Sequence, residues 1–183
     1  MADPREFMPL HIAILTVSDT RTLADDKSGQ TLQDRITTAE HTIADRQIVK
    51  DDVTKIRRIV KAWSKRSDID VIISTGGTGL TGRDVTIEAL RPLFEKEIEG
   101  FSTLFHMISF SKIGTSTVQS RATAGVMKGK YIFCLPGSPG ACRDAWDEIL
   151  KYQLDYRHQP CNFVEIMPRL EEHQKRKKGQ ARA

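Results

Sequence analysis

Long apolar runs are missing from this sequence of 183 residues, and none approaches the roughly 18–20 residues of a membrane-spanning helix. The first residues, MADPREFMPL, contain no basic region followed by an apolar stretch, so we do not expect a secretory signal. Cysteine is scarce: Cys134, Cys142 and Cys161 are odd in number and lack C-x-x-C spacing. These absences predict a protein with no membrane segment and no disulfide framework, whose reduced thiols suit the cytoplasm.

The sequence also lacks the spacing of a metal site built on histidine or cysteine. Its histidines are widely scattered along the chain: His11, His41, His106, His158 and His173. Cys134 lies within an apolar run and is expected to be a packed thiol rather than a nucleophile. No internal repeat and no linker interrupts the chain, which predicts one domain over residues 10–170, with flexible termini at 1–9 and 171–183.

The charge balance gives little support to a nucleic-acid partner. The net charge is +4 and the pI is near 9.0, but much of the excess lies in the C-terminal tail. The basic residues of this tail are Lys175, Arg176, Lys177, Lys178 and Arg182. Such charge runs are usually solvated and disordered, and no aromatic-rich basic surface is visible elsewhere in the sequence.

The apolar pattern alternates between strand-like runs and helix-like periodicity. Strands are expected at residues 11–18, 42–49, 71–75, 123–127 and 131–135, and helices at 29–40, at 53–63 and after residues 84, 100 and 139. The second strand is the more polar and is expected toward a sheet edge, whereas the last two strands flank Lys128-Gly129-Lys130 and indicate a hairpin. The order predicts a three-layer α/β/α fold with a mainly parallel sheet and one antiparallel hairpin.

A set of apolar residues before residue 110 recurs at helical spacing. They are Ile98, Phe101, Leu104, Phe105 and Ile108. We expect them to form the buried stripe of a helix, as core or subunit contact, rather than a cofactor site.

Residues 71–84, VIISTGGTGLTGRD, contain the clearest functional pattern. A buried strand is expected to stop at Gly76-Gly77-Thr78-Gly79. Because glycine has no Cβ, its backbone reaches positive φ and lets a ligand approach the amides closely. A strand that ends in such a loop before a helix is a typical anion site, and phosphate is the usual anion.

Two well-known phosphate loops fit this stretch incompletely. Gly77, Gly79 and Gly82 match the dinucleotide pattern G-x-G-x-x-G, but the acidic residue needed about 20 positions later falls in helical sequence. A P-loop needs Lys and Ser or Thr where this chain has Arg83 and Asp84. An aspartate repels phosphate oxygens directly but can meet them through a metal ion, so we reject both patterns.

A second strand-to-helix turn lies at Pro136–Gly140. Ser138 is a favourable N-cap and Pro139 a favourable first helical residue. Open α/β sheets bind ligands beyond the carboxyl ends of their strands, where both turns are expected to lie. The sequence therefore predicts one ligand site to which both turns contribute.

Three motifs in order resemble the MoaB/MogA family of molybdenum cofactor biosynthesis proteins. They are Ser74–Gly79 with Arg83–Thr86, Gly114–Thr117 with Ser120–Ala122, and Leu135–Gly140. The resemblance extends from Ile12 to Phe163, and Glu99-Gly100-Phe101 and Gln159–Phe163 are most similar to the MoaB branch. It implies a Rossmann-like, molybdopterin-binding fold and assembly as a homo-oligomer, either a trimer or a hexamer. Other proteins of the pathway are compatible partners.

The resemblance also implies an activity, the transfer of AMP from Mg-ATP to the terminal phosphate of molybdopterin with release of pyrophosphate. The implied ATP-binding residues are Thr75, Gly76, Gly77, Thr78, Gly79, Pro136, Gly137, Ser138 and Gly140. The implied molybdopterin ligands are Ser109, Thr115, Ser116, Ser120 and Arg121. Hydroxyl groups and a guanidinium suit a polar pterin and its phosphate.

Asp51 and Asp84 match the two aspartates that the family requires for catalysis, and both are expected to hold Mg²⁺. This ion favours carboxylates together with phosphate oxygens and retained waters. Because Asp52 is adjacent, the sequence leaves open which of the pair faces the site and which caps the following helix. A cap role is likewise an alternative for Asp84. Two functions remain open: an active adenylyltransferase, and a molybdopterin-binding scaffold protein without turnover.

Overall fold

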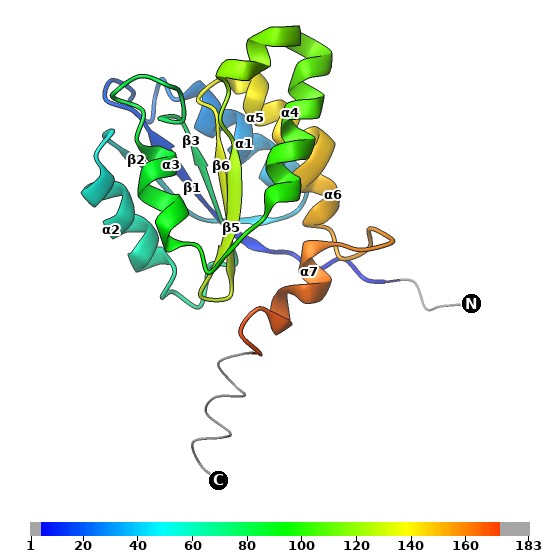
Figure 1. Cartoon of the computed structure of the whole chain (residues 1–183). Helices are drawn as coiled ribbons and strands as arrows, with labels where there is room; N and C mark the ends of the chain where they lie inside the picture. Colours follow the sequence, from blue (N-terminus) through cyan, green and yellow to red (C-terminus); the bar gives the residue numbers. More distant parts are fainter. Residues whose placement is uncertain (1–4, 173–183) are drawn as a thin grey trace.

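A six-stranded sheet forms the centre of the protein in a computed structural model that describes residues 5–172 (Figure 1). Its strand order is β2-β1-β3-β6-β5-β4. The strands are β1 (His11–Val17), β2 (Thr42–Val49), β3 (Val71–Thr75), β4 (Lys96–Glu97), β5 (Thr123–Met127) and β6 (Lys130–Leu135). The predicted α/β class is confirmed, and β2 lies at the sheet edge as expected from its polar sequence.

The parallel part of the sheet comprises β2, β1, β3 and β6, and the hairpin of β5 and β6 supplies the predicted antiparallel pair. The hairpin turns at Lys128 and Gly129, whose φ angles are 50° and 71°. The sequence did not predict β4, which pairs antiparallel with β5 through only two residues. So short a strand has no periodicity of its own and forms because β5 offers it an edge.

Seven α-helices and four other helical segments connect or follow the strands in the described residues. The α-helices are α1 (Lys27–Thr38), α2 (Val53–Trp63), α3 (Thr86–Leu90), α4 (Glu99–Ile113), α5 (Pro139–Ala145), α6 (Lys151–Gln153) and α7 (Phe163–Ile166). The others are η1 (Arg91–Leu93), η2 (Gly114–Gln119), the π-helical η3 (Trp146–Leu150) and η4 (Met167–Arg169). No helix within residues 5–172 combines the length and apolar character needed to span a membrane.

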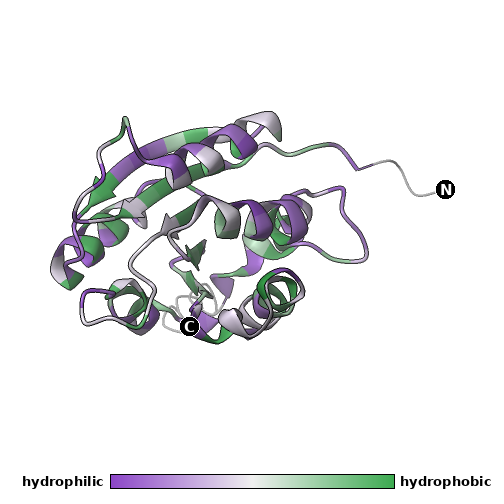
Figure 2. Ribbon diagram, turned by 90° about the horizontal axis from the view of Figure 1, so that it is seen from above, coloured by the Kyte–Doolittle hydropathy of each residue, from purple (hydrophilic) through white to green (hydrophobic). Residues whose placement is uncertain are grey.

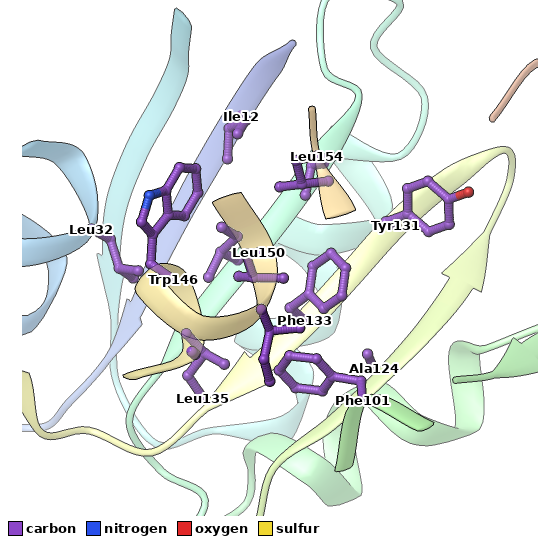
Figure 3. Close-up of a cluster of buried hydrophobic side chains, with 14 of the residues drawn as sticks. Ile12, Leu32, Phe101, Ala124, Tyr131, Phe133, Leu135, Trp146, Leu150 and Leu154 are labelled. Carbon is purple, nitrogen blue, oxygen red and sulfur yellow. The ribbon is translucent and has the colours of Figure 1, made fainter. Parts of the chain in front are cut away.

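The two faces of the sheet carry separate hydrophobic clusters, which makes the fold three-layered. One cluster packs α1, α4 and α5 against Ile12, Ile14 and Phe133, and Figure 3 shows part of it around Phe101 and Trp146. The other packs α2 and α3 against alternate residues of the same strands. Strands buried on both faces read as continuous apolar runs, which explains the sequence pattern. The helices mix hydrophilic and hydrophobic residues along their length (Figure 2).

Helix α1 is shifted from its predicted limits, and helix α3 is short. Helix α1 begins at Lys27, two residues early, because Asp26 accepts a hydrogen bond from the Gly29 amide at 2.9 Å and caps it. The helix after Asp84 ends already at Leu90 and continues as the short 3-10 turn η1 before an extended residue. Pro92 has no amide hydrogen to donate to the Glu88 carbonyl, so the α-helical hydrogen-bond ladder cannot continue, and that carbonyl accepts from Arg57 instead.

The apolar stripe expected as core or subunit contact is only partly buried within one copy of the chain. Phe101 and Phe105 are buried in α4, but Leu104 is 42 % exposed. Helix α4 is apolar on more than one face, so periodicity alone could not assign the buried side. Cys134, by contrast, is the packed thiol expected: it is fully buried, and burial raises its pKa to about 12.

The predicted domain limits at residues 10 and 170 stay a prediction, although residues before the first limit contact the domain. Arg5 forms an ion pair with Glu165, and the ring of Phe7 lies 5.2 Å from that of His41. The basic tail residues named above and His173 lie outside the described residues.

Candidate functional site

The carboxyl ends of β1, β3 and β6 meet at one edge of the sheet, because these strands are parallel neighbours (Figure 1). Strand β5 runs the other way, and its first residue Thr123 pairs with Cys134 near the end of β6. The segment before β5 therefore reaches the same edge. Both predicted turns and the segment 114–121 are thus brought to this edge.

The glycine loop after β3 has the backbone geometry that the sequence indicated. Gly76 has a φ of 93° and Gly77 a φ of 62°. A Cβ on Gly76 would lie 2.3 Å from the Val17 carbonyl oxygen. A Cβ on Gly77 would lie 2.5 Å from the Thr86 hydroxyl and 2.6 Å from a carboxylate oxygen of Asp51. Both positions therefore require glycine on grounds of conformation and of space.

Hydrogen bonds fix the loop while leaving part of it available. The Gly76 amide donates to the Leu135 carbonyl at 3.1 Å. The Thr86 hydroxyl donates to the Gly76 carbonyl and the Thr86 amide to the Gly77 carbonyl, both at 2.8 Å. In the described part of the chain, the amides of Gly77 and Thr78 donate to no protein acceptor. Free amides on a rigid loop are suitable donors to phosphate oxygens.

The second turn lies directly against the first. A Cβ on Gly137 would lie 3.0 Å from the Cα of Gly76. Ser138 accepts a hydrogen bond from the Ala141 amide at 3.1 Å and caps α5, and Pro139 is the first helical residue. The predicted pairing of the two turns and both predicted cap roles are confirmed.

The structure distinguishes the two adjacent aspartates before α2. Asp52 accepts from the Lys55 amide at 2.9 Å and is the N-cap of α2. The Asp51 carboxylate instead lies against the glycine loop, next to Gly77. Asp51 is therefore the member of the pair that faces the candidate site, and Asp52 fills the cap role.

Asp84 also points to the glycine loop and does not cap the following helix. Its Oδ2 accepts from the Thr81 amide at 2.9 Å and from the Thr81 hydroxyl at 2.6 Å. A Cβ on Gly79 would lie 2.8 Å from the same oxygen. Helix α3 has Val85 at its N-cap position, with no side-chain cap. Asp51 therefore lies at Gly77 of the loop, and Asp84 lies at Gly79.

The two carboxyl groups differ in their electrostatic setting. Burial, and then the charge of Asp84, raise the pKa of Asp51. The Thr81 hydroxyl chiefly lowers the pKa of Asp84, with help from the Thr81 and Gly79 amides. Asp51 forms no ion pair with any basic residue in the described segment. The carboxylate is partly exposed and so remains accessible to a ligand.

The predicted molybdopterin ligands are distributed over one segment at the edge. Thr115 and Ser116 lie exposed in η2, and Ser120 follows it half-buried. Ser109 differs, because it is only 7 % exposed and accepts a hydrogen bond from Thr117 at 3.0 Å. Its hydroxyl is thus used within the protein beneath this segment.

Arg121 lies closest to the glycine loop. Its Nε donates to the Thr78 carbonyl at 2.8 Å, and its Nη1 and Nη2 donate to Glu88 at 2.5 and 3.2 Å. The Glu88 hydrogen bond is the main cause that raises the pKa of Arg121. Sequence reasoning missed Glu88, whose place on a short helix next to Thr86 was the only available signal.

Sequence reasoning also missed a polar cavity of about 130 Å³ beside the two turns. It is lined by the end of β1, the start of α1 and both turns, through Thr16, Val17, Ser18, Arg21, Asp26, Lys27, Ser28, Thr75, Gly76, Gly137 and Pro139. The run Asp26-Lys27-Ser28-Gly29 at a helix start was a signal for it in the sequence. A larger cavity of about 440 Å³ is lined by Glu95, Val126 and Leu170 and contains none of the predicted site residues.

The floor of the small cavity is a buried ionic group. Asp26 is 3 % exposed, accepts from the Thr16 hydroxyl at 2.7 Å and pairs with Arg46 at 3.2 Å. Ser28 donates to the Gly137 carbonyl at 3.0 Å, which ties α1 to the second turn. This cavity therefore continues the candidate site toward β1.

Comparison with known proteins gives this arrangement a family. The pattern of a probable molybdopterin binding domain matches residues 13–156. The chain belongs to the molybdopterin-binding MoaB/MogA family. It is 52% identical over 158 residues to molybdenum cofactor biosynthesis protein B of Escherichia coli K12, which covers 86% of this chain and 93% of that protein.

Solved structures agree with this membership in the MoaB/MogA family. The crystal structure of a molybdenum cofactor biosynthesis protein B matches with a TM-score of 0.78 and 44% identity, over 83% of this chain and 93% of that one. The tungsten cofactor synthesizing protein MoaB from Pyrococcus furiosus matches with a TM-score of 0.70 and 34% identity, over 78% and 91%. The predicted family, fold and closeness to the MoaB branch are confirmed.

Proposed function

We propose that this member of the MoaB/MogA family is a molybdopterin adenylyltransferase that acts in molybdenum cofactor biosynthesis. The observation that carries the proposal is the convergence of Asp51 and Asp84 on one glycine loop. The two residues come from different segments, and each carboxylate lies where a Cβ on a loop glycine would touch it, at Gly77 and Gly79. Phosphate-binding amides and two carboxylates in one place suit the chemistry of a nucleoside triphosphate.

The proposed reaction needs no protein nucleophile. An oxygen of the molybdopterin terminal phosphate attacks the α-phosphorus of ATP. The bond from that phosphorus to the oxygen bridging to the β-phosphate breaks, and pyrophosphate leaves with the bonding electrons. Because the attacking oxygen is already anionic, the protein has only to hold the two phosphates in line and to offset the developing charge.

The two carboxylates also fit a magnesium ion. The described residues contain no group of three or more His, Cys, Asp or Glu side chains that could hold a metal by themselves. Magnesium, however, is commonly held by one or two carboxylates together with substrate phosphates. We propose Asp84 and Asp51 as its ligands, and the ion would neutralise phosphate charge when bound. The partial exposure of Asp51, and the charge of Asp84 that together with burial raises the pKa of Asp51, support this role, because a cation between two carboxylates relieves their repulsion.

We assign the ATP phosphates to the two turns in contact with each other. Within the loop Thr75–Gly79, the donors are the free amides of Gly77 and Thr78, and the turn Pro136–Gly140 bounds them on the β6 side. The molybdopterin side is assigned to the exposed hydroxyls of Thr115 and Ser116, with Ser120 and Arg121. Ser109 supports this segment from beneath, through its hydrogen bond with Thr117.

We also propose that the protein is a homo-oligomer. Helix α4 and η2 expose large apolar side chains on one stretch of chain: Leu104, Met107, Phe110, Ile113 and Val118. We call these five residues the apolar α4 face. The last two are 52% and 82% exposed. A helix that is apolar around much of its circumference is normally covered, and a second copy of the chain is the cover we propose.

The alternative is a molybdopterin-binding scaffold protein of the same pathway without turnover. Both functions would keep the segment at residues 114–121. Only the enzyme needs the pair of carboxylates at the glycine loop, and both are present here. The reaction would take place in the cytoplasm, where ATP is available and where the free thiols of Cys134, Cys142 and Cys161 suit a reducing environment.

One experiment separates the two functions. Purified protein is incubated with magnesium, molybdopterin and ATP labelled at the α-phosphate, and the products are separated by chromatography. The enzyme transfers the label to molybdopterin and releases an equal amount of pyrophosphate. A wild-type protein that binds molybdopterin but transfers no label would be the scaffold instead.

A further inference from the structure

Glu88 and Arg121 form a connection to the glycine loop that the proposed reaction does not use directly. Arg121 donates to both carboxylate oxygens of Glu88 and, through Nε, to the Thr78 carbonyl at 2.8 Å. The donors of a guanidinium lie in one rigid plane. Three simultaneous contacts therefore fix the orientation of that plane relative to the loop.

The contact at Thr78 acts on the neighbouring amide as well. The Thr78 carbonyl and the Gly79 N–H belong to one planar trans peptide unit, in which these groups point in opposite directions. The Gly79 amide faces the Asp84 carboxylate, whose pKa it helps to lower, and Asp84 Oδ2 lies where a Cβ on Gly79 would be 2.8 Å away. Arg121 thus holds one end of the peptide while the Asp84 carboxylate lies at the other.

The helix that carries Glu88 is anchored at both ends. At its start, the Thr86 hydroxyl donates to the Gly76 carbonyl at 2.8 Å. At its end, Arg57 of α2 donates to the carbonyls of Ala89 at 2.9 Å and Glu88 at 3.1 Å. The Glu88 side chain therefore projects from a fixed backbone, which suits a role in holding another group.

We propose that Glu88 is a positioning residue for Asp84: it holds Arg121 on the Thr78 carbonyl and so sets the peptide that presents the Gly79 amide to the carboxylate. The reaction that Asp84 serves rests on the proposed function, but the orientation of the peptide does not. A direct phosphate contact by Arg121 is a different role. It would use the two guanidinium hydrogens that these contacts leave over, and its loss would raise KM for molybdopterin rather than lower kcat.

The variant that tests the proposal is Glu88→Gln, which keeps the size of the side chain and removes its charge. Glu165→Gln is the matched control, because Arg5 donates to both oxygens of Glu165 at 3.1 and 3.3 Å. The exposures of that pair, 27% and 41%, are close to the 28% and 50% of Arg121 and Glu88. Neither partner of the control pair belongs to the candidate site.

The first readout is hydrogen exchange of the Gly79 amide, measured by NMR on the protein without substrates. We expect exchange about 10-fold faster in Glu88→Gln, as for loss of one charge-assisted hydrogen bond, and no change in Glu165→Gln. Arg121→Lys keeps the charge but loses the planar guanidinium that contacts Glu88 and Thr78 together, so it should give the same increase in the exchange rate of the Gly79 amide. In the double variant the effects should not add, because Glu88 acts through Arg121.

The second readout is the division of the kinetic effect. We expect kcat of Glu88→Gln to fall about 10- to 100-fold, as when a ligand-orienting residue is lost, with a smaller effect on KM for molybdopterin, which Arg121 also contacts in the proposed function. The proposal would be overturned if the Gly79 amide exchanged at the same rate in Glu88→Gln as in the wild type. It would also be overturned if the variant had a raised KM and an unchanged kcat. If the wild type transfers no label, the proposed function fails, while the Gly79 comparison still decides the role of Glu88.

Discussion

Replacing Asp51 and Asp52 one at a time should give opposite results, although the two residues are adjacent. Asp52 caps α2 through the Lys55 amide, whereas Asp51 lies against Gly77 in the glycine loop. Asp52→Ala should therefore lower stability and leave adenylylation nearly unchanged. Asp51→Asn should abolish most of the turnover while the protein remains folded.

The size of the stability effect follows from the cap. Loss of a side-chain N-cap destabilises a protein by about 1 kcal/mol, and for a chain of this length that corresponds to a fall in Tm of about 2–4 °C. Asp52→Asn keeps a side-chain oxygen that accepts from the Lys55 amide, so it should retain most of the stability that Asp52→Ala loses. The Lys55–Asp52 ion pair, at 3.9 Å with both side chains more than a third exposed, adds little.

The pH dependence of Asp51→Asn provides an independent check. Burial and the charge of Asp84 raise the pKa of Asp51, so the folded protein binds this proton more tightly than the unfolded chain. The ionised group therefore lowers stability, and the effect develops as pH rises from the unfolded pKa, near 3.9, through the folded value. Asp51→Asn should be as stable as wild type at pH 3 and more stable at pH 7.

Thermal unfolding at several pH values, combined with the label-transfer assay, measures all of these quantities. The assignment would be refuted if Asp52→Ala lost turnover while Asp51→Asn kept it. It would also fail if Asp51→Asn were the less stable of the two variants at pH 7.

Two further predictions concern the loop and the assembly. Gly77→Ala should lower the free energy of unfolding by at least about 1–2 kcal/mol, because alanine is strained in the left-handed backbone conformation at this position. Its Cβ would also lie 2.5 Å from the Thr86 hydroxyl, so the loop must shift and ATP-analogue binding should be lost. Gly82→Ala, whose Cβ would meet nothing within 4 Å, should change stability by less than about 0.5 kcal/mol in unfolding measurements, and equal losses would contradict the account. Phe110→Glu on the apolar α4 face should shift the protein to monomer in sedimentation velocity. Leu23→Glu, at a similarly exposed residue outside that face, should not, and an unchanged Phe110→Glu assembly would exclude the face as the interface.

The sequence was sufficient for features that depend on local chemistry. The apolar runs predicted the main strands, and Ser138 and Pro139 marked the start of α5 correctly. The sequence could not predict the direction of side chains at the start of α2. Asp51 and Asp52 carry the same carboxyl group, and only the packing of α2 shows which one turns to Gly77. Strand β4 and the buried side of α4 likewise depend on neighbours distant in the sequence. Glu88 became visible only when the fold brought it to Arg121.

The membership of the MoaB/MogA family is established, so the central open claim is that the two aspartates make this site catalytic. The most direct test compares wild type with Asp84→Asn in a single turnover with excess protein, Mg-ATP and molybdopterin, and measures molybdopterin binding in parallel. We predict label transfer by the wild type, a rate about 100-fold or more lower for Asp84→Asn, and similar molybdopterin binding by both proteins. Equal transfer rates for the two proteins would contradict the account.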